Sequence, residues 1–482
     1  MNFPWRYVPA VLALFLVTGT VRVNADVRLP AILSAHALLQ KSPATAIWGW
    51  ADPAEAVTVT LGSQKAEAVA DAKGRWVVRL DLSSVGPGPF ELTVSGRNKL
   101  VVTDVLVGDV WLSSGQSNMQ YTLNATTKGG EEIARSANNQ LRWFMAENSD
   151  QFLELQKDVP GHWVIASPGT SGDCSGVAYY FGKKLQADLK IPVGLILTAV
   201  GGTTIQSWMS DHALDQDEAL KAQKAHDLAA EKKDPAMTST FSYNQLIAPL
   251  ESLSLRGVIW YQGEAHFNQG ALYRKAFPLL IRDWRRLWQQ PGLPFLWCQL
   301  PNLDKKTPDP GMEGWVADLR DAQSSALAEP HTGEVILIDV GAVDLHPKNK
   351  EIVGMRLANL AEASTYGRTV PTDNPRLDSA KIEGRQVVIH FKGCPGGLGP
   401  HDLPARTKPN LAGSPVQGFA LCGADHRWVW AQASIEGDSV QVESPQVAEP
   451  VEVRYAWSNN PTCNLYNRDG LPAVPFQVDL KK

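Results

Sequence analysis

The stretch VWLSSGQSNMQY, residues 110–121, begins as a run of apolar residues and ends in a small, polar turn. Gly115 can adopt backbone angles that other residues avoid, and Gln116, Ser117 and Asn118 can all form hydrogen bonds. A strand that turns into a helix here would expose the Ser117 hydroxyl beside free backbone N–H groups. A serine in such a turn is by itself most often a helix cap. The stretch therefore indicates a nucleophile loop only if the rest of the chain supplies its partners.

Strand-like and helix-like segments alternate along the chain after this turn. We predict strands within residues 193–202, 256–264, 293–300 and 334–341, and helices over residues 176–190, 272–288 and 350–364. The segment from Leu272 to Trp288 is typical, because its apolar residues recur at helical spacing. This alternation predicts an α/β fold with a mostly parallel sheet and helices on both faces. In such folds ligands bind outside the carboxyl ends of the strands.

Short β-prone runs separated by Gly, Pro and Ser turns lie on both sides of the alternating region. Residues 26–103 predict an N-terminal β-sandwich domain, and residues 367–482 predict a C-terminal β-rich domain. The α/β domain then covers residues 104–366, with a charged helical insertion at about residues 211–237. The N-terminal β-domain lacks any cluster of His, Cys and carboxylate residues, so we expect the chemistry in the middle domain.

Composition and charge argue against a nucleic-acid binder. The chain has 482 residues, of which 44% are hydrophobic and 20% charged, as is ordinary for folded globular proteins. The formal net charge is −5, and no block of Lys and Arg stands out. Because nucleic-acid binders carry a basic patch, we expect no nucleic-acid partner.

The first 25 residues are typical of a secretory signal peptide. Arg6 gives a positive start, a short apolar run follows over residues 8–20, and small residues precede Asp26. The alternative is a membrane anchor, but the run is shorter than the roughly 20 residues that span a bilayer. We therefore expect cleavage of residues 1–25, export to the periplasm or the medium, and no membrane association afterwards.

The spacing of the cysteines does not indicate a zinc site. They are Cys174, Cys298, Cys394, Cys422 and Cys463, without CxxC or Cys/His ligand spacing. Because their number is odd, at least one thiol stays free. The last three lie in one C-terminal segment, where either one disulfide or buried free thiols are compatible with the sequence.

Four polar loops are expected to open on the same edge of the predicted sheet. They are SSGQSNM (113–119), VGGTTIQSW (200–208), WYQGEAH (260–266) and AVDLHPKNK (342–350). A serine needs a base within hydrogen-bond reach and a group that orients the base. His346 is the candidate base for Ser117, and Asp344 is the candidate orienting group. The chain order Ser, Asp, His is also that of α/β hydrolases.

Acyl transfer further needs donors aimed at the developing oxyanion. Gly201 and Gly202 can bring a backbone N–H close to a substrate, although a glycine pair is also a common tight turn. Gln262 can supply a side-chain amide, or a structural hydrogen bond at a strand end. Gln116 and Asn118 are expected to fix or extend the hydrogen bonding around Ser117.

Three more residues near these loops are candidates for substrate contact or support. Glu264 is the alternative to Asp344 as the group that orients His346, and it could also bind a substrate hydroxyl or be a plain surface charge. His266 is expected to contact substrate or solvent rather than act as a second base. Trp208 lies close to the proposed loops and is a candidate for stacking on a sugar, although most of the 16 tryptophans should be core residues.

At these loops the sequence resembles the SGNH/GDSL hydrolase superfamily, and more closely the sialate O-acetylesterase-like carbohydrate esterases. The resemblance spans about residues 104–476. Six motifs carry it in order: GDVWLSSGQSNMQY, VGLILTAVGGTTIQSW, RGVIWYQGEAH, DWRRLW, DLHPKNKEIVGMRLA and VRYAWSNNPTCNLYNRDGLPAVPF. Two departures stand out. The usual DxxH spacing is shortened to Asp344-Leu345-His346, and the frequent QGESN reads QGEAH.

The resemblance implies a flavodoxin-like SGNH domain with added β-domains. It also implies hydrolysis of O-acetyl esters on sugars through an acyl-enzyme, without metal or cofactor. By motif, Ser117 corresponds to the nucleophile, His346 to the base and Asp344 to its partner. The backbone of Ser117 and Gly202 correspond to oxyanion donors, and Gln262 stands where many relatives have an asparagine.

The leading hypothesis is a secreted serine esterase that acts on an O-acetylated carbohydrate, with sialic acid, xyloglucan and xylan as candidate sugars. The alternative is a non-catalytic glycan-binding protein with an idle SGNH domain, which the presence of nucleophile, base and oxyanion candidates disfavours. A lipase of the same superfamily would predict an apolar lid, whereas the insertion after Asp211 is charged.

Overall fold

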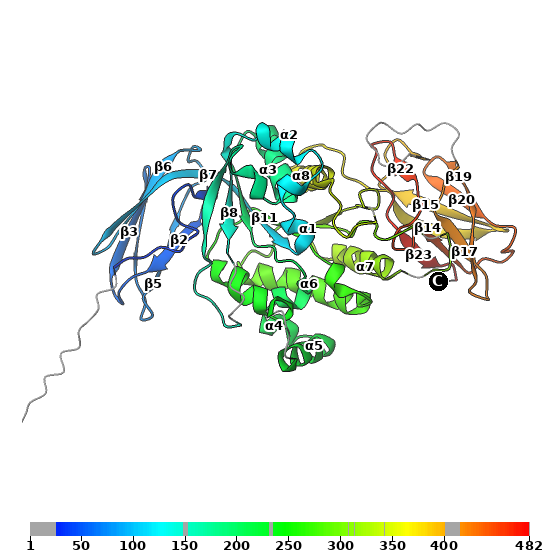
Figure 1. The fold of residues 1–482 in the computed structure, drawn as a ribbon, viewed down its shortest axis with the longest axis horizontal. Coiled ribbons are helices and arrows are strands. Elements are labelled where there is room, and N and C mark those ends of the chain that lie inside the picture. The colour runs from blue at the N-terminus through cyan, green and yellow to red at the C-terminus, as the bar shows by residue number, and fades with distance from the viewer. Residues whose placement is uncertain are drawn as a thin grey trace, which may run out of the picture.

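The computed structural model describes residues 26–147, 153–230, 235–306, 308–312, 314–341, 343–400 and 415–481. The predicted signal peptide lies outside the described residues. An N-terminal β-domain, a central α/β domain and a C-terminal β-domain follow one another along the long axis of the molecule (Figure 1). No helix within the described ranges is both long and apolar enough to cross a membrane.

The central sheet is mostly parallel, as the alternating pattern predicts. Its order is β13 (Thr332–Val335), β12 (Phe295–Cys298), β11 (Gly257–Tyr261), β7 (Lys99–Gly115), β10 (Val193–Leu197), β8 (Asn138–Ala146) and β9 (Gly161–Ala166). Only the edge strand β9 runs antiparallel to its neighbour on this path. All residues of β10 and β11 are buried, which explains their continuous apolar sequence.

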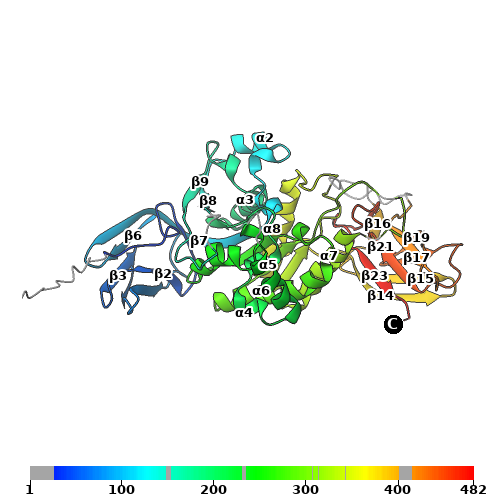
Figure 2. The same ribbon diagram turned by 60° about the horizontal axis from the view of Figure 1, so that its bottom comes forward.

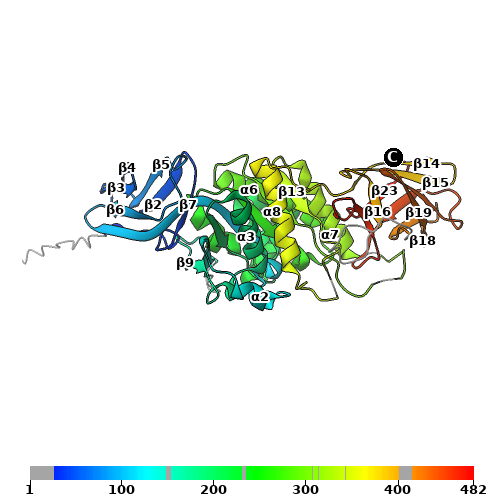
Figure 3. The same ribbon diagram turned by 90° about the horizontal axis from the view of Figure 1, so that it is seen from above.

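Helices cover both faces of this sheet (Figure 1). On one face α3 (Gly176–Leu189) lies beside α8 (Lys350–Tyr366), as Figure 3 shows from above. On the other, α6 (Gly270–Leu287) packs against α7 (Trp315–Ser324). Helix α8 ends where Gly367 takes a positive φ of 66° and its N–H bonds the carbonyl of Glu362.

The described residues of the charged segment predicted as a helical insertion form short helices. The segment contains α4 (Asp211–Leu214), α5 (Glu218–Ala229) and a short 3-10 turn at Pro235–Met237. Asp217 caps α5 by accepting hydrogen bonds from the N–H groups of Ala219 and Leu220. Both helices lie against α6, on its side away from the sheet (Figure 1), and Figure 2 views the molecule with this side turned forward.

The N-terminal β-domain shares a strand with the central sheet. Its strands are β1 (Leu38–Gln40), β2 (Thr45–Trp50), β3 (Ala56–Leu61), β4 (Gln64–Val69), β5 (Arg75–Leu80) and β6 (Phe90–Ser95). The 17-residue β7 pairs with β6 near its start and with β10 and β11 near its end. The predicted domain boundary between residues 103 and 104 therefore falls inside one continuous strand.

The C-terminal β-domain consists of antiparallel strands around a second apolar core, to which Ile336 and Ile338 of the central domain also contribute. One sheet has the order β14 (Arg376–Glu383), β15 (Gln386–Lys392), β20 (Ser439–Glu443) and β19 (Gln432–Glu436), and the other β18 (Trp428–Trp430), β17 (Phe419–Cys422), β21 (Glu452–Tyr455) and β23 (Phe476–Asp479). A third pair joins β16 (Leu398–Pro400) to β22 (Leu465–Asn467). All five cysteines are free thiols, so the structure follows the alternative without a disulfide.

Arg320 joins the central domain to the C-terminal β-domain. Its side chain on α7 is fully buried. The guanidinium donates hydrogen bonds to the carbonyls of Leu300 and Pro301 in the central domain, and of Ser458 and Asn459 in the β-domain. Burial lowers the pKa of this guanidinium to about 9. Four carbonyl groups can be bound at once because the guanidinium of arginine is rigid, planar and carries five N–H donors.

The turn at residues 115–118 requires its glycine. Gly115 has a φ of 136°, and a Cβ atom built on it would lie 2.2 Å from the carbonyl oxygen of Tyr261 in the neighbouring strand. The Gln116 N–H donates to that same oxygen at 3.0 Å, and α1 (Ser117–Gln120) begins directly afterwards. The close approach of β7 and β11 thus brings Ser117 out of the sheet edge.

We expect Gly115→Ala to destabilise the protein by about 1–3 kcal/mol, because the strained φ and the clash with Tyr261 both act on backbone atoms. Urea unfolding followed by circular dichroism measures the effect. Gly130→Ala is the matched control, since nothing lies within 4 Å of a Cβ built there. Equal stability of the two variants would contradict the requirement.

Candidate active site

Ser117 and His346 meet at the carboxyl edge of the parallel sheet. Ser117 is the first residue of α1, after β7, and His346 lies in the segment between β13 and α8. His346 Nε2 is 2.8 Å from Ser117 Oγ. With a neutral imidazole the hydroxyl donates to Nε2, which is the arrangement of a serine nucleophile and its general base. Both side chains are only partly buried, so a substrate can reach them.

The position of His346 is set by contacts on two sides. Its ring stacks on Tyr121, with ring centroids 5.9 Å apart and planes 25° from parallel. The carbonyl of the preceding residue, Leu345, accepts a hydrogen bond from Asn118 Nδ2 at 3.0 Å. Burial lowers the pKa of His346 below its usual 6.5, and the positive charge of Lys350 lowers it further.

The lowered pKa predicts a pH dependence. A general base must be neutral, and His346 becomes protonated only as the pH falls through its lowered pKa. We therefore expect the acid limb of kcat/KM to have its midpoint below pH 6.5. The measurement is kcat/KM on an acetyl ester from about pH 4 to pH 8. A midpoint above 6.5 would show that the environment stabilises the imidazolium instead.

Asp344 does not contact His346, which corrects the expected serine–histidine–aspartate arrangement. Its side chain is exposed, and the described residues contain no hydrogen bond or ion pair between its carboxylate and the imidazole. The chain bends at every residue from 343 to 346. These bends turn the Leu345 carbonyl towards Asn118 and His346 towards Ser117, while Asp344 faces solvent.

We expect Asp344→Asn to lower kcat by less than about tenfold, because no contact with His346 is lost; a triad aspartate would cost about 10⁴-fold. Steady-state kinetics on an acetyl ester distinguishes the two results. A loss of a thousandfold or more would mean that Asp344 swings onto His346 when substrate is bound. Asp378→Asn, an exposed carboxylate in the C-terminal β-domain, is the control.

Two backbone N–H groups beside Ser117 can bind an oxyanion. The Gly201 N–H is already used, because it donates to Gln120 Oε1 at 3.1 Å. A Cβ on Gly201 would lie 3.5 Å from the Cβ of Ser117, so this loop runs directly beside the candidate nucleophile. The N–H groups of Ser117 and Gly202 have no acceptor among the described residues. The two N–H groups that the family resemblance assigns to the oxyanion site are therefore free to bind a substrate oxygen.

Gln262 is not an oxyanion donor in this structure, but makes structural hydrogen bonds, which was the other expectation. Its side chain is fully buried, and Nε2 donates to Gln116 Oε1 at 3.2 Å and to the Thr203 carbonyl at 3.0 Å. Since both N–H bonds of the amide are engaged, Gln262 offers none to a substrate. Gln116 Oε1 also accepts from the N–H groups of Gly263 and Ala265. The two glutamines thus hold the loops after β7, β10 and β11 together.

His266 and Trp208 are also structural, in contrast to the expected contacts with substrate or solvent. Both are fully buried. His266 Nε2 accepts a hydrogen bond from the Ile205 N–H at 2.8 Å, and burial lowers the pKa of this imidazole to about 4. Trp208 Nε1 donates to Thr203 Oγ1 at 2.9 Å. Both side chains therefore support the loop after β10, in which Gly202 lies.

Residues 107–350, half of the chain, match the family described as carbohydrate esterase, sialic acid-specific acetylesterase. The chain belongs to this family. Human sialate O-acetylesterase is 31% identical over 93% of this chain and 92% of its own, and the mouse enzyme is 29% identical over 97% of both. A crystal structure of a carbohydrate acetylesterase from Xanthomonas citri is 38% identical, with a TM-score of 0.83 over 94% of this chain and 99% of that chain.

Membership of this carbohydrate esterase family makes the protein a carboxylic ester hydrolase. It also confirms the SGNH-type α/β fold with an added C-terminal β-domain, because the Xanthomonas citri structure covers both parts.

In this esterase a buried polar network lies beneath Ser117 and His346. Asn118, fully buried, donates through Nδ2 to Glu264 Oε1 and accepts through Oδ1 from Lys350 Nζ. The Lys350 ammonium also lies 5.1 Å from the ring centroid of Tyr121 and 5.2 Å from that of Tyr261. Glu264 therefore binds Asn118 and not His346, so the alternative orienting group is absent as well.

The network contains two ionisable groups with shifted pKa values. Burial raises the pKa of the Glu264 carboxyl, against the opposing effects of its hydrogen bonds and of Lys350. Burial lowers the pKa of Lys350 to about 8, against the attraction of Glu264. Sequence reasoning missed Lys350, although it closes the AVDLHPKNK loop. The sequence feature that could have identified it is a lysine at the start of an otherwise apolar helix face, because a buried charge needs a partner.

Proposed function

We propose that Ser117 and His346 hydrolyse O-acetyl esters on sugars through an acetyl-enzyme. The observation that carries the proposal is the 2.8 Å contact between Ser117 Oγ and His346 Nε2 at the carboxyl edge of the sheet. Family membership supplies the reaction class, and the free N–H groups of Ser117 and Gly202 support the assignment of the oxyanion site.

The first half of the reaction forms the acetyl-enzyme. Ser117 Oγ attacks the acetyl carbonyl carbon while His346 Nε2 takes the hydroxyl proton. The negative charge that develops on the carbonyl oxygen is stabilised by the N–H groups of Ser117 and Gly202, each donor contributing about 3 kcal/mol. His346 then gives its proton to the sugar oxygen as the carbon–oxygen ester bond breaks.

The second half releases acetate. Water attacks the acetyl carbonyl while His346 takes a proton from it, and His346 then gives this proton to Ser117 Oγ as the tetrahedral intermediate collapses to acetate and free Ser117. Only Ser117, His346 and backbone donors take part in this scheme, so it needs no residue outside the loops already described.

The substrate class is an O-acetylated carbohydrate. The curated human and mouse relatives are named sialate O-acetylesterases, and the Xanthomonas citri relative is titled a carbohydrate acetylesterase. These names support testing acetylated sialic acid together with acetylated xyloglucan and xylan. We further propose that residues 1–25 direct export and are removed before Asp26, which N-terminal sequencing of the exported protein would test.

The deciding experiment measures acetate release from the three acetylated glycans by the wild type and by Ser117→Ala. Release from one glycan that vanishes in the variant supports the serine mechanism and names the sugar. Undiminished release by Ser117→Ala would reject the nucleophile. No release from any glycan, with sugar binding retained, would favour a non-catalytic glycan-binding protein.

A further inference from the structure

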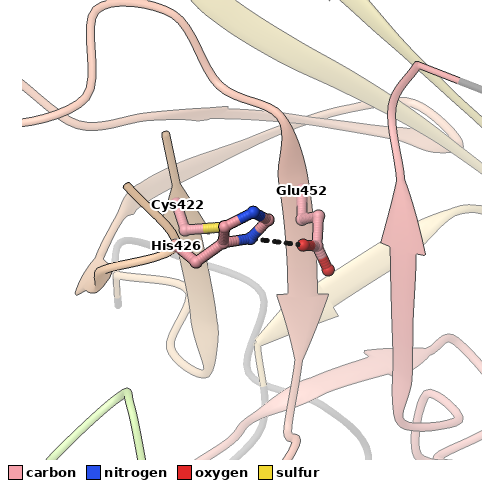
Figure 4. Close-up of side chains that lie close together, drawn as sticks. All are labelled: Cys422, His426 and Glu452. Atoms are coloured by element: carbon pink, nitrogen blue, oxygen red, sulfur yellow. Dashed lines mark hydrogen bonds and ion pairs between the residues drawn. The ribbon is translucent and has the colours of Figure 1, made fainter. Parts of the chain in front are cut away.

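Three side chains with metal-binding atoms converge at one end of the C-terminal β-domain (Figure 4). Cys422 is the last residue of β17, and it pairs directly with Glu452, the first residue of β21. His426 lies in the turn between β17 and β18. One sulfur, one imidazole nitrogen and one carboxylate oxygen all lie within 4.8 Å of one another.

Neighbouring contacts hold the turn and the carboxylate in place. The His426 N–H donates to the Gly423 carbonyl at 2.9 Å, and His426 adopts a left-handed φ of 55°. One oxygen of Glu452 is 3.1 Å from His426 Nδ1, and the other accepts a hydrogen bond from Gln477 Nε2 at 2.9 Å. A carboxylate that is anchored through its second oxygen is typical of metal sites, where such contacts orient the ligands.

The cluster is open to solvent on one side. The His426 side chain is 72% exposed, whereas that of Glu452 is 20% exposed. Both line a surface pocket of about 700 Å³, together with Trp428, Trp430 and Asp309. An ion can therefore enter from the pocket, and water can occupy a coordination position that the protein leaves open.

We propose that Cys422, His426 and Glu452 bind a zinc-class divalent cation, with solvent as the fourth ligand. The mixed set of sulfur, nitrogen and oxygen donors suits zinc, whereas magnesium and calcium prefer oxygen alone. Ligand atoms of a tetrahedral zinc site lie about 3.5 Å apart, given bonds of about 2.0–2.3 Å. The observed separations, at most 4.8 Å, need only small side-chain rotations to reach this geometry.

The bound ion would act on the β-domain rather than on the ester bond. Cys422 would bind as a thiolate, releasing its proton to solvent. Ligation would fasten the turn after β17 to β21 and so fix the edge of the pocket that carries Trp428 and Trp430. The sequence did not indicate this site, because Glu452 reaches the other two ligands only through the pairing of β17 with β21.

Cobalt(II) is the probe that tests the proposal, since it replaces zinc and shows a thiolate charge-transfer band in the near ultraviolet. We titrate the chelator-treated full chain with cobalt(II) under a reductant that carries no thiol. We expect the band to reach its full intensity at one equivalent of cobalt(II). Added zinc should abolish the band, and zinc should raise the Tm of the protein. Absence of the band in the folded wild type would overturn the proposal.

Two variants and one control assign the ligands. Cys422→Ser should abolish the band, whereas Cys394→Ser, which changes a cysteine of the same domain outside the cluster, should retain it. His426→Asn keeps the left-handed turn accessible, and should weaken cobalt binding at least about tenfold. Because His426 is exposed, this variant tests the site even if Cys422→Ser fails to fold. Unchanged binding in His426→Asn, or equal loss in Cys394→Ser, would reject the assignment.

Discussion

Replacing His346 with alanine is expected to lower kcat by about 10⁴-fold or more, because Ser117 then lacks the base 2.8 Å from its hydroxyl. KM is expected to change little, since the imidazole contacts the nucleophile and not the sugar. Steady-state kinetics on an acetyl ester measures both parameters, and circular dichroism checks that the variant is folded.

The double variant Ser117→Ala/His346→Ala makes the test stricter. If two residues act as one unit, kcat of the double variant falls by about as much as kcat of the more severely affected single variant. Independent residues would multiply their losses. Multiplied losses, or a His346→Ala variant that keeps more than a tenth of wild-type kcat, would show that another group is the base. His390→Ala, a histidine on the exposed face of β15, is the matched control.

Replacing Asn118 with alanine is expected to lower the free energy of unfolding by about 3–5 kcal/mol, because it removes hydrogen bonds to two buried charged groups, each worth about 1.5–3 kcal/mol. Asn118 is the only bridge by hydrogen bonds between Glu264 and Lys350 among the described residues, and without it both groups lose a partner inside the protein. The same change removes the bond to the Leu345 carbonyl and so loosens His346. We therefore expect kcat to fall by tenfold or more as well.

Urea unfolding and kinetics on the same preparations measure the two effects of Asn118→Ala. Asn124→Ala is the matched control, because Asn124 is an exposed asparagine in the same region of the chain. A destabilisation below about 1 kcal/mol would mean that Glu264 and Lys350 form a direct ion pair when Asn118 is removed. A large loss of stability without a loss of kcat would show that the buried polar network does not position His346.

Most of the fold could be predicted from the sequence, because its signals are local. The apolar runs of β10 and β11 and the helical spacing in α6 each lie within one segment, and the structure places these elements as predicted. The boundary at residues 103/104 could not be predicted in this way. Strand β7 runs from the N-terminal β-domain into the central sheet without a turn, and Gly108 lies inside the strand without interrupting it, so the sequence shows no break where the pairing partner changes.

The candidate site could be predicted only in part. Ser117 and His346 were found because a polar residue after a parallel strand must lie at the carboxyl edge of the sheet. Gln262 and His266 follow a strand in the same way, yet they point into the protein and bind Gln116 and Ile205. A position at the end of a strand places a side chain near the site, but it does not determine whether the polar atoms of that side chain are already hydrogen-bonded within the protein.

By itself the sequence determined the fold class, the edge of the sheet that carries the site and the serine and histidine that meet there. Only the tertiary structure decided that Asp344 faces solvent and that Asn118 joins Glu264 to Lys350. The physical reason is that a hydrogen bond needs a partner at about 3 Å. For these side chains the partners come from loops and helices far apart in the chain, which only folding brings together.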